Sequence, residues 1–442
     1  MHSVTRIPSD TDLPKRASVV VIGGGIAGIA TALELTERGL DVVVVEKGEI
    51  AAEQSGRNWG WCRQMGRDPR ERPLIRISLG LWDGMNERIG GETGFNRCGI
   101  LYLCDTDARL AAKQKWFEDN ARPARLSTRI IGSREIDGLV TGGAKPWKGA
   151  LFTPDDGRAE PFIAVPAMAL GARRKGTKIF TNCAARGLET SAGRVSAVVT
   201  EKGVITCDAI VLAGGAWSRR FCHNLGISLP QLTVVNSAMR TEPLETGINT
   251  SCSGAGFAFR KRMDGGYTIT HNHLSVADIT PDSFRLFTQF LPALLMDWKG
   301  LRLRLGKEFL DEAGLGRRWA LDQVSPFEQV RILSPEPVNT ILDEAAASLK
   351  AHYPAFTSMK IAERWAGAID VTPDAVPIIS KVGQLEGFHL ATGFSGHGFG
   401  LGPGAGKLMA ELVTGEIPSV DPSPFRYSRF SDGSNPRPIT GL

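Results

Sequence analysis

The sequence predicts an α/β fold that joins a parallel-sheet domain to a second domain with a mixed sheet. Three observations carry this prediction. A continuous apolar run, Val19–Ile22, ends in a glycine turn, as expected for a strand buried on both faces. A second apolar run, Val42–Val45, follows a helical segment. The same pattern of buried strand and glycine turn returns near residue 208, so the chain revisits its first domain late.

The first glycine turn fits the phosphates of a dinucleotide. Gly23, Gly25 and Gly28 occur in the order G-x-G-x-x-G, which allows a tight turn, close approach of a pyrophosphate and close helix packing. The helix that follows, about residues 26–38, would face the phosphates with its free N–H groups. Glu46 ends the second apolar run, where an acid binds a ribose hydroxyl and disfavours a 2′-phosphate. We therefore predict a Rossmann-like unit that binds FAD or NAD.

The composition excludes several other classes of protein. The chain has 442 residues, 42% hydrophobic and 22% charged, with a scattered net charge of +5, so we expect no nucleic-acid partner. No apolar run approaches the roughly 20 residues that span a bilayer, and no secretory signal is evident. Seven cysteines without a C-x-x-C pattern suggest a cytoplasmic protein with no metal site.

The segments after the first unit alternate between helical and strand patterns. Helices are expected at about 73–89, 106–119 and 160–175, and strands at 99–104, 178–181, 195–200 and 203–207. Residues 208–212 form another buried strand, which ends in the turn 213–218. The arginines at 67, 70, 72 and 76 are expected to lie mostly on a solvated face.

The middle of the chain, about 232–364, predicts a separate lobe. Residues 233–239, 256–259 and 266–271 are expected to be strands, and residues 281–309 a helix. Leu301–Leu305 alternates with arginine, so a strand there remains the alternative.

A second glycine-rich turn, Gly393–Phe399, follows an apolar strand near the end of the chain and leads into a helix at about 403–413. So many glycines indicate a backbone pressed against a flat group, or several residues with positive φ. Together with residues 23–28, 213–218 and 370–379, this turn resembles the D-amino-acid-oxidase-like family of FAD enzymes. That family includes sarcosine, glycine and glutamylputrescine oxidases and amino-acid dehydrogenases.

The resemblance implies two lobes and FAD as the cofactor. The FAD-binding domain would combine residues 1–95, 150–231 and 361–442, and the substrate domain would combine 96–149 and 232–360. The residues expected to contact FAD are Gly23, Gly25, Ile26, Ala27, Gly28, Glu46, Lys47, Ser55, Arg57, Asn58, Ala213, Gly214, Trp217, Gly367, Gly393, Ser395, Gly396, His397, Gly398 and Phe399.

Two departures from the family's pattern bear on the chemistry. Sarcosine-oxidase-like members attach FAD through a cysteine in the region that reads Trp365-Ala366-Gly367-Ala368 here, so FAD is expected to bind noncovalently. Those members also carry a lysine where this chain has Gly400, and another lysine near the position of Tyr267. The two missing lysines argue against a sarcosine oxidase, and the absence of the second also argues against an oxidase.

The resemblance implies FAD-dependent oxidation of an amino acid or secondary amine. A hydride would pass from the carbon next to nitrogen to flavin N5, and the resulting imine would hydrolyse. His271 is the expected base, with Arg57 and Tyr267 as further catalytic residues. Arg57, then Arg63 and Arg260, are candidates for binding a substrate carboxylate. Trp59, Trp61, Phe257 and Phe394 are candidates for an aromatic wall.

Other functions remain open from the residues alone. The chain would pass electrons to oxygen or to an electron-acceptor protein. It is alternatively the FAD subunit of a multi-subunit dehydrogenase, a flavin-dependent tRNA-modification module, or an NAD-binding structural or regulatory protein. No second strand–GxGxxG–helix unit occurs, so a separate NAD(P)H site is not expected.

Overall fold

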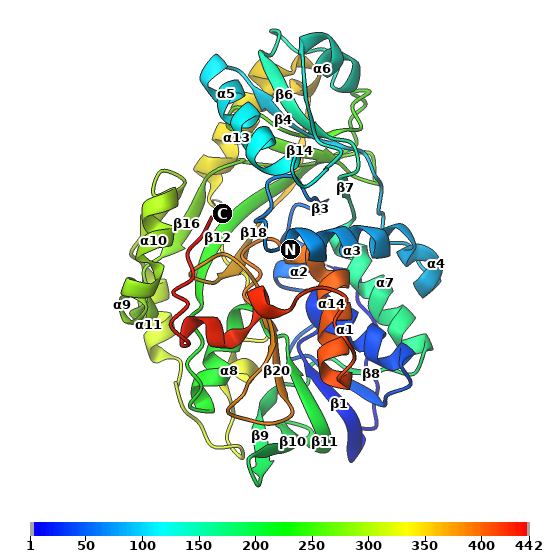
Figure 1. The fold of residues 1–442 in the computed structure, drawn as a ribbon, viewed down its shortest axis with the longest axis vertical. Helices are drawn as coiled ribbons and strands as arrows, with labels where there is room; N and C mark the ends of the chain where they lie inside the picture. The colour runs from blue at the N-terminus through cyan, green and yellow to red at the C-terminus, as the bar shows by residue number, and fades with distance from the viewer. Residues whose placement is uncertain (1–3, 440–442) are drawn as a thin grey trace.

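The computed structural model describes residues 4–439, and two large sheets dominate this part of the chain (Figure 1). The first sheet has the order β19-β20-β11-β1-β2-β8, with β10 and β9 continuing from β11. Its outer strands are β19 (Ile378–Lys381), β10 (Arg194–Thr200) and β9 (Ala185–Ser191). The second has the order β17-β16-β12-β15-β14-β13-β4-β6-β5, with β18 beside β12. The predicted fold class, a Rossmann-like domain with a second mixed sheet, is confirmed.

The centre of the first sheet is parallel and fully buried. β1 (Arg16–Ile22) lies between β2 (Val42–Val45) and β11 (Gly203–Leu212), with Ile22 opposite Val45 on one side and Leu212 on the other. The two strands expected at 203–207 and 208–212 are therefore one strand. β8 (Lys178–Phe180) extends the parallel set beside β2. β20 (Phe388–Thr392) pairs with β11, so a strand from near the end of the chain lies in this sheet.

Helices α1 (Ile26–Glu37), α3 (Arg72–Asp83), α7 (Pro161–Arg174) and α14 (Gly398–Thr414) pack together beside this sheet. Small residues allow α1 and α14 to approach closely. A Cβ atom at Gly406 would lie 2.5 Å from Ala30 Cβ, so a larger residue there would force the helices apart. The helix expected at 73–89 is divided at Gly84 into α3 and α4 (Met85–Ile89).

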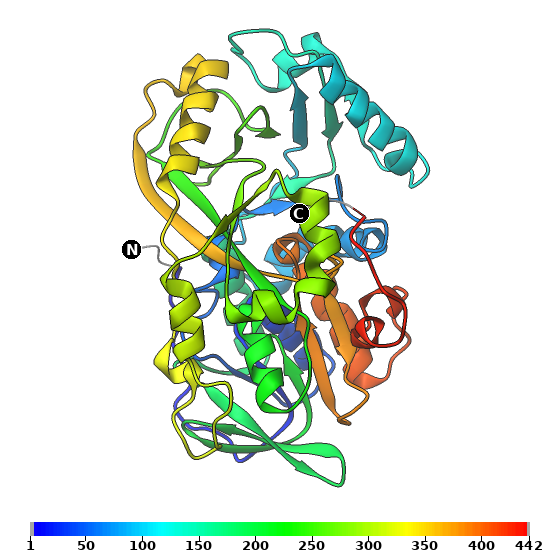
Figure 2. The same ribbon diagram turned by 90° about the vertical axis from the view of Figure 1, so that its left-hand side faces the viewer.

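The second sheet is mixed and centres on two long antiparallel strands, β12 (Leu232–Thr241) and β18 (Ile361–Val371). Figure 2 shows this green and orange pair running side by side through the molecule. β6 (Gly149–Thr153) and β18 both pair in this sheet, outside the ranges expected for the substrate domain. α13 (Asn339–His352) covers the sheet through Leu342 and Leu349, which join a buried aromatic core.

The remaining strands of this sheet are β4 (Ile100–Cys104), β5 (Arg129–Ile131), β13 (Ser251–Ser253), β14 (Ala258–Lys261), β15 (Tyr267–Thr270), β16 (Ser275–Asp278) and β17 (Leu301–Arg304).

The helix expected at 281–309 is wrong over its second half. The structure has α9 (Pro281–Arg285) and α10 (Phe287–Asp297), then β17, which pairs in parallel with β16. α11 (Lys307–Gly314) follows. The leucine–arginine alternation of residues 301–304 thus forms the strand that the alternative interpretation predicted.

Within residues 4–439, no helix is both long and apolar enough to cross a bilayer. All seven cysteines are free thiols.

Candidate functional site

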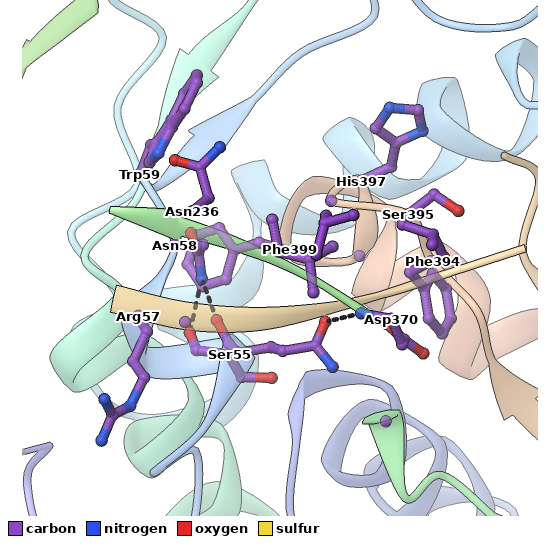
Figure 3. A pocket seen from close by; sticks show the side chains of 18 of the residues that line it. Ser55, Arg57, Asn58, Trp59, Asn236, Asp370, Phe394, Ser395, His397 and Phe399 are labelled. Carbon is purple, nitrogen blue, oxygen red and sulfur yellow. Dashed lines mark hydrogen bonds between the residues drawn. The ribbon is translucent and has the colours of Figure 1, made fainter. Parts of the chain in front are cut away.

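A cavity of about 1070 Å³ lies between the two sheets. Its walls come from segments that are far apart in the sequence: the start of α1, the loop after β2, the end of β11, the β12–β18 pair and the loop before α14. Figure 3 shows side chains from several of these segments around the cavity, among them Asn58, Asn236 and Ser395. The volume is at the upper end of the range for small-molecule sites, so it has room for a large ligand.

One end of the cavity has the geometry of a phosphate site. α1 starts after Gly25 with no side-chain cap, and Gly25 and Ile26 line the cavity. The Ile26 N–H donates to Ser55 Oγ over 2.9 Å. Gly28 does not line the cavity; a Cβ atom there would lie 2.0 Å from the Gly23 carbonyl oxygen. Gly28 therefore acts through packing, while Gly25 leaves space in front of the helix N-terminus.

Glu46 is fixed by the backbone beside this site. Its two carboxylate oxygens accept hydrogen bonds from the N–H groups of Gly24 and Gly48, each over 2.7 Å. Burial raises the pKa of Glu46. Lys47 pairs with Glu53 over 2.6 Å and lies over the Trp217 ring. The Glu46 carboxylate therefore lies where a ribose hydroxyl is expected to bind. The Lys47 ammonium is already engaged by Glu53.

The glycine-rich turn before α14 forms another wall. Ser395 adopts φ +50°, and its hydroxyl accepts from the Thr372 N–H and donates to the Gly393 carbonyl. Gly393 itself does not line the cavity. Its N–H donates over 2.6 Å to the carboxylate of Asp370, which also accepts from Gln231 over 2.9 Å. Sequence reasoning missed this role of Asp370, a buried carboxylate that holds the turn in place.

His397 lies in the same turn and pairs with a second buried acid. Its Nδ1 lies 3.1 Å from a carboxylate oxygen of Glu71 on the segment before α3. Burial and the neighbouring Arg67 guanidinium lower the pKa of His397. The imidazole is therefore neutral near pH 7 and donates from Nδ1. Glu71 and Arg67 are both buried. The arginines at 67, 70, 72 and 76 were expected to lie mostly on a solvated face, and this expectation is wrong for Arg67.

His271 lines the cavity from the second sheet, but its geometry argues against the expected base. Its Nδ1 accepts from the N–H groups of His273 and Leu274, over 3.2 and 3.1 Å. The ring proton therefore sits on Nε2, so neither nitrogen has a lone pair available for a substrate proton. Burial also lowers the pKa of His271. A hydrogen-bond donor is the role that this geometry supports.

Two of the three arginines considered for a substrate carboxylate are already engaged. Arg57 donates to the carbonyl oxygens of Ala52 and Ala366, over 2.8 and 3.0 Å, and its guanidinium points away from the labelled cavity residues in Figure 3. Arg260 forms a buried bidentate ion pair with Glu160, in which its two Nη atoms donate to the two carboxylate oxygens over 2.7 and 3.0 Å. Arg63 lines the cavity and stays a candidate.

Tyr267 lies in the core of the second domain, not in the cavity. It is fully buried, and its hydroxyl donates to the Ile248 carbonyl over 2.7 Å. Phe257 lies in the same aromatic core. Trp59, Trp61 and Phe394 do line the cavity, so part of the expected aromatic wall is present.

The structure brings most of the predicted site residues to this one cavity. Those that line it are Gly23, Gly25, Ile26, Ala27, Glu46, Lys47, Ser55, Arg57, Asn58, Ala213, Gly214, Trp217, His271, Gly367, Ser395, Gly396, His397, Gly398 and Phe399. Gly28, Gly393 and Tyr267 do not.

These residues fit FAD and offer no metal centre. The open N-terminus of α1, the fixed Glu46 carboxylate and the glycine turn before α14 supply sites for phosphate, ribose and a flat ring along one continuous cavity. Within residues 4–439, no group of three or more His, Cys, Asp or Glu side chains is placed to hold a metal ion.

Comparisons with known proteins agree with this geometry. Residues 18–412 match the model of a family described as FAD dependent oxidoreductase (DAO). The structure of L-amino acid deaminase from Proteus myxofaciens in complex with anthranilate aligns with a TM-score of 0.93 at 36% identity, covering 97% of each chain.

Two curated relatives are more distant in sequence. Sarcosine oxidase subunit beta from Rhizobium meliloti is 25% identical over 423 residues, which cover 94% of this chain and 88% of that protein. The 4-methylaminobutanoate oxidase (formaldehyde-forming) of Paenarthrobacter nicotinovorans is 25% identical over 437 residues. That match covers 97% of this chain but only 47% of the relative, so the chain spans about half of its length.

Proposed function

Because this chain belongs to the DAO family of FAD dependent oxidoreductases, we propose that it oxidises an amino acid or a secondary amine at the carbon next to nitrogen. The main support is the cavity described above, because it joins the dinucleotide-type turn of the first sheet to the β12–β18 pair of the second. One solved relative, the L-amino acid deaminase from Proteus myxofaciens, supports an amino acid as the substrate.

Bound FAD supplies the two-electron redox chemistry. The chain's own residues bind the FAD and orient it. The N–H groups at the start of α1 hold the phosphates, and the Glu46 carboxylate accepts from a ribose hydroxyl. The turn from Gly396 to Phe399, fixed by Asp370 below it, forms the surface for the ring. We propose noncovalent binding, since residues 365–368 contain no cysteine.

On the substrate side, His271 and Arg63 carry the proposed contacts. The Nε2–H of His271 donates to the substrate from the second sheet. Arg63 binds a carboxylate from the loop after β3 (Trp61–Cys62). Trp59 and Trp61, whose ring centroids lie 5.8 Å apart in an edge-to-face pair, restrict water beside the substrate.

The test is anaerobic reduction of the flavin. The purified holoprotein is mixed without oxygen with a panel of amino acids and secondary amines, and the flavin absorbance is followed. At least one compound is expected to bleach the flavin. Admission of air then separates an oxidase, which recolours rapidly and forms peroxide, from a dehydrogenase, which recolours slowly. A flavin that no amine reduces would contradict the proposal.

A second candidate, an FAD subunit of a multi-subunit enzyme, is favoured by the match to sarcosine oxidase subunit beta. It predicts that the chain purifies from its source with another polypeptide and that its turnover rises when that polypeptide is added. A homogeneous chain with full turnover would argue against this candidate. We further propose a cytoplasmic location, which the free state of all seven cysteines supports.

A further inference from the structure

The cavity carries an excess of positive charge at the end near Tyr102. Arg63 and Arg67 follow β3, and Lys113 comes from α5 (Asp107–Trp116); all three line the cavity. Among the described residues, no carboxylate lies within ion-pair distance of any of them. These three cations are called the cationic cluster below.

Arg67 is the most buried member, with 2% of its surface exposed. Its Nε donates to the Arg63 carbonyl over 3.2 Å, while its Nη1 is buried without a hydrogen-bond partner among residues 4–439. Burial and the nearby Arg63 guanidinium lower the pKa of Arg67. A buried cation with an unpaired donor is costly, and a bound anion offsets that cost.

Arg63 and Lys113 lie over the same aromatic ring. The Arg63 guanidinium is 5.9 Å and the Lys113 ammonium 4.7 Å from the Tyr102 ring centroid. Arg63 Nη1 donates to the Met65 carbonyl. Lys113 lines the cavity from α5, a helix that buries no residue and lies at the outer edge of the molecule (Figures 1 and 2). Its neighbour Arg109 pairs with Asp105 over 2.9 Å.

The nearby acids, Glu71 and Asp156, have other hydrogen-bond partners than the cationic cluster. Glu71 pairs with His397. The carboxylate oxygens of Asp156 accept from the N–H groups of Gln64 and Met65, over 2.8 and 3.2 Å. Burial raises the pKa of Asp156 to about 7, so this group is partly protonated near neutral pH. Two cations on the loop after β3 and a third on α5 are therefore open to a ligand. If one substrate carboxylate binds both arginines, Lys113 is left for a second anionic group.

We infer that the substrate carries two anionic groups, as in an amino acid with a second carboxylate, and that the cationic cluster binds both. Arg63 and Arg67 bind one group deep in the cavity, and Lys113 binds the second near the mouth. This inference rests on the proposed function, because it names the substrate class of the same site.

The first test measures binding without turnover. Glutarate and pentanoate have the same chain length, differ by one carboxylate and carry no amine to oxidise. The holoprotein is titrated with each, and the shift in flavin absorbance gives the dissociation constant. Glutarate is expected to bind at least about 10-fold more tightly, as one additional charge-assisted hydrogen bond provides. Equal affinities would overturn the inference.

Variants of α5 locate the second group. Lys113→Gln is expected to reduce the glutarate-to-pentanoate preference toward 1. Lys115→Gln is the matched control, since Lys115 is on the same helix, 79% exposed at its side chain and paired with Asp119. It is expected to keep the wild-type preference. α5 buries no residue, so both variants are expected to fold. A preference that survives in Lys113→Gln would overturn the assignment.

A kinetic comparison separates this inference from the proposed function. Glutamate is expected to reduce the flavin at lower concentration than glutamine, which has nearly the same shape. If neutral amino acids reduce the flavin and glutamate has no advantage, the inference fails and the proposed function stands. If glutarate binds selectively and no amine reduces the flavin, the anion site stands and the proposed function fails.

Discussion

At the scale of single residues, two glycines of one motif have different physical tasks. A Cβ atom at Gly28 would lie 2.0 Å from the Gly23 carbonyl oxygen, which is backbone and cannot move aside. At Gly25 the nearest atom is Ser55 Oγ, at 3.1 Å. Gly28 is needed for α1 to pack on β1, whereas Gly25 is needed for access to the helix N-terminus.

This difference predicts distinct outcomes for substitutions. Gly25→Val is expected to fold but to bind FAD at least roughly 10-fold more weakly, since the added methyl groups lie in front of the N–H groups that hold phosphate. Flavin content after reconstitution and apoprotein melting temperature are the measurements. Gly80→Ala on α3 is the control, because no atom lies within 4 Å of a Cβ there. A Gly25→Val protein with full FAD would contradict the assignment of the phosphate turn.

For some single residues, the sequence was sufficient to predict a position at the site. Gly23, Gly25 and Glu46, which were expected to bind FAD, all line the cavity, because their positions follow from local order along one strand–turn–helix unit. Arg57 and His271 were placed in the cavity too, but their functional atoms are engaged by Ala366 and by the backbone after His271. Such partners come from tertiary structure, which spacing along the chain does not determine.

At the scale of elements, prediction was most exact for buried segments and least exact between residues 281 and 314. β1, β2 and α1 each have a pattern that burial dictates. α10 and α11 bury no residue, so neither has a core-facing stripe to mark its ends. Arg67, in the segment before α3, was wrong for another reason, because it is buried although it is charged, as is the neighbouring Glu71 that pairs with His397. Charge alone predicted solvent exposure for Arg67.

β20 makes an element-scale prediction about pH. All five of its residues are buried, and burial lowers the pKa of His389. The unfolded chain takes up a proton near pH 6.5, before the folded protein does. This histidine's contribution to stability is therefore complete above about pH 6.5 and is lost as pH falls through the lowered folded-state value.

His389→Gln removes this titration. Urea unfolding at pH 8 and pH 5 is expected to show a smaller loss of stability on acidification for the variant than for the wild type. Burial also lowers the pKa values of His271 and His397, so some acid sensitivity is expected to persist. An unchanged difference between the two pH values would show that His389 is not held neutral by the fold.

At the scale of the whole molecule, the cavity depends on segments from both sheets and both ends of the chain. Its walls include Gly25 near the start, Asn236 and Gly367 on β12 and β18, and His397 before α14. Trp365 donates to the Arg57 carbonyl over 2.9 Å, which ties β18 to the short helix α2 (Gln54–Arg57). A ligand in this cavity therefore contacts both halves of the molecule at once.

FAD is accordingly expected to stabilise the entire chain. A ligand that binds only the folded state adds about 2.7 kcal/mol when present at 100 times its dissociation constant. Melting of the apoprotein followed by circular dichroism should move to higher temperature with each addition of FAD, and limited proteolysis should slow in both domains. NAD at equal concentration is the control. A cofactor held by the first sheet alone would protect residues 16–45 and leave β12 and β18 as sensitive as before, and that pattern would contradict a site shared by the two sheets.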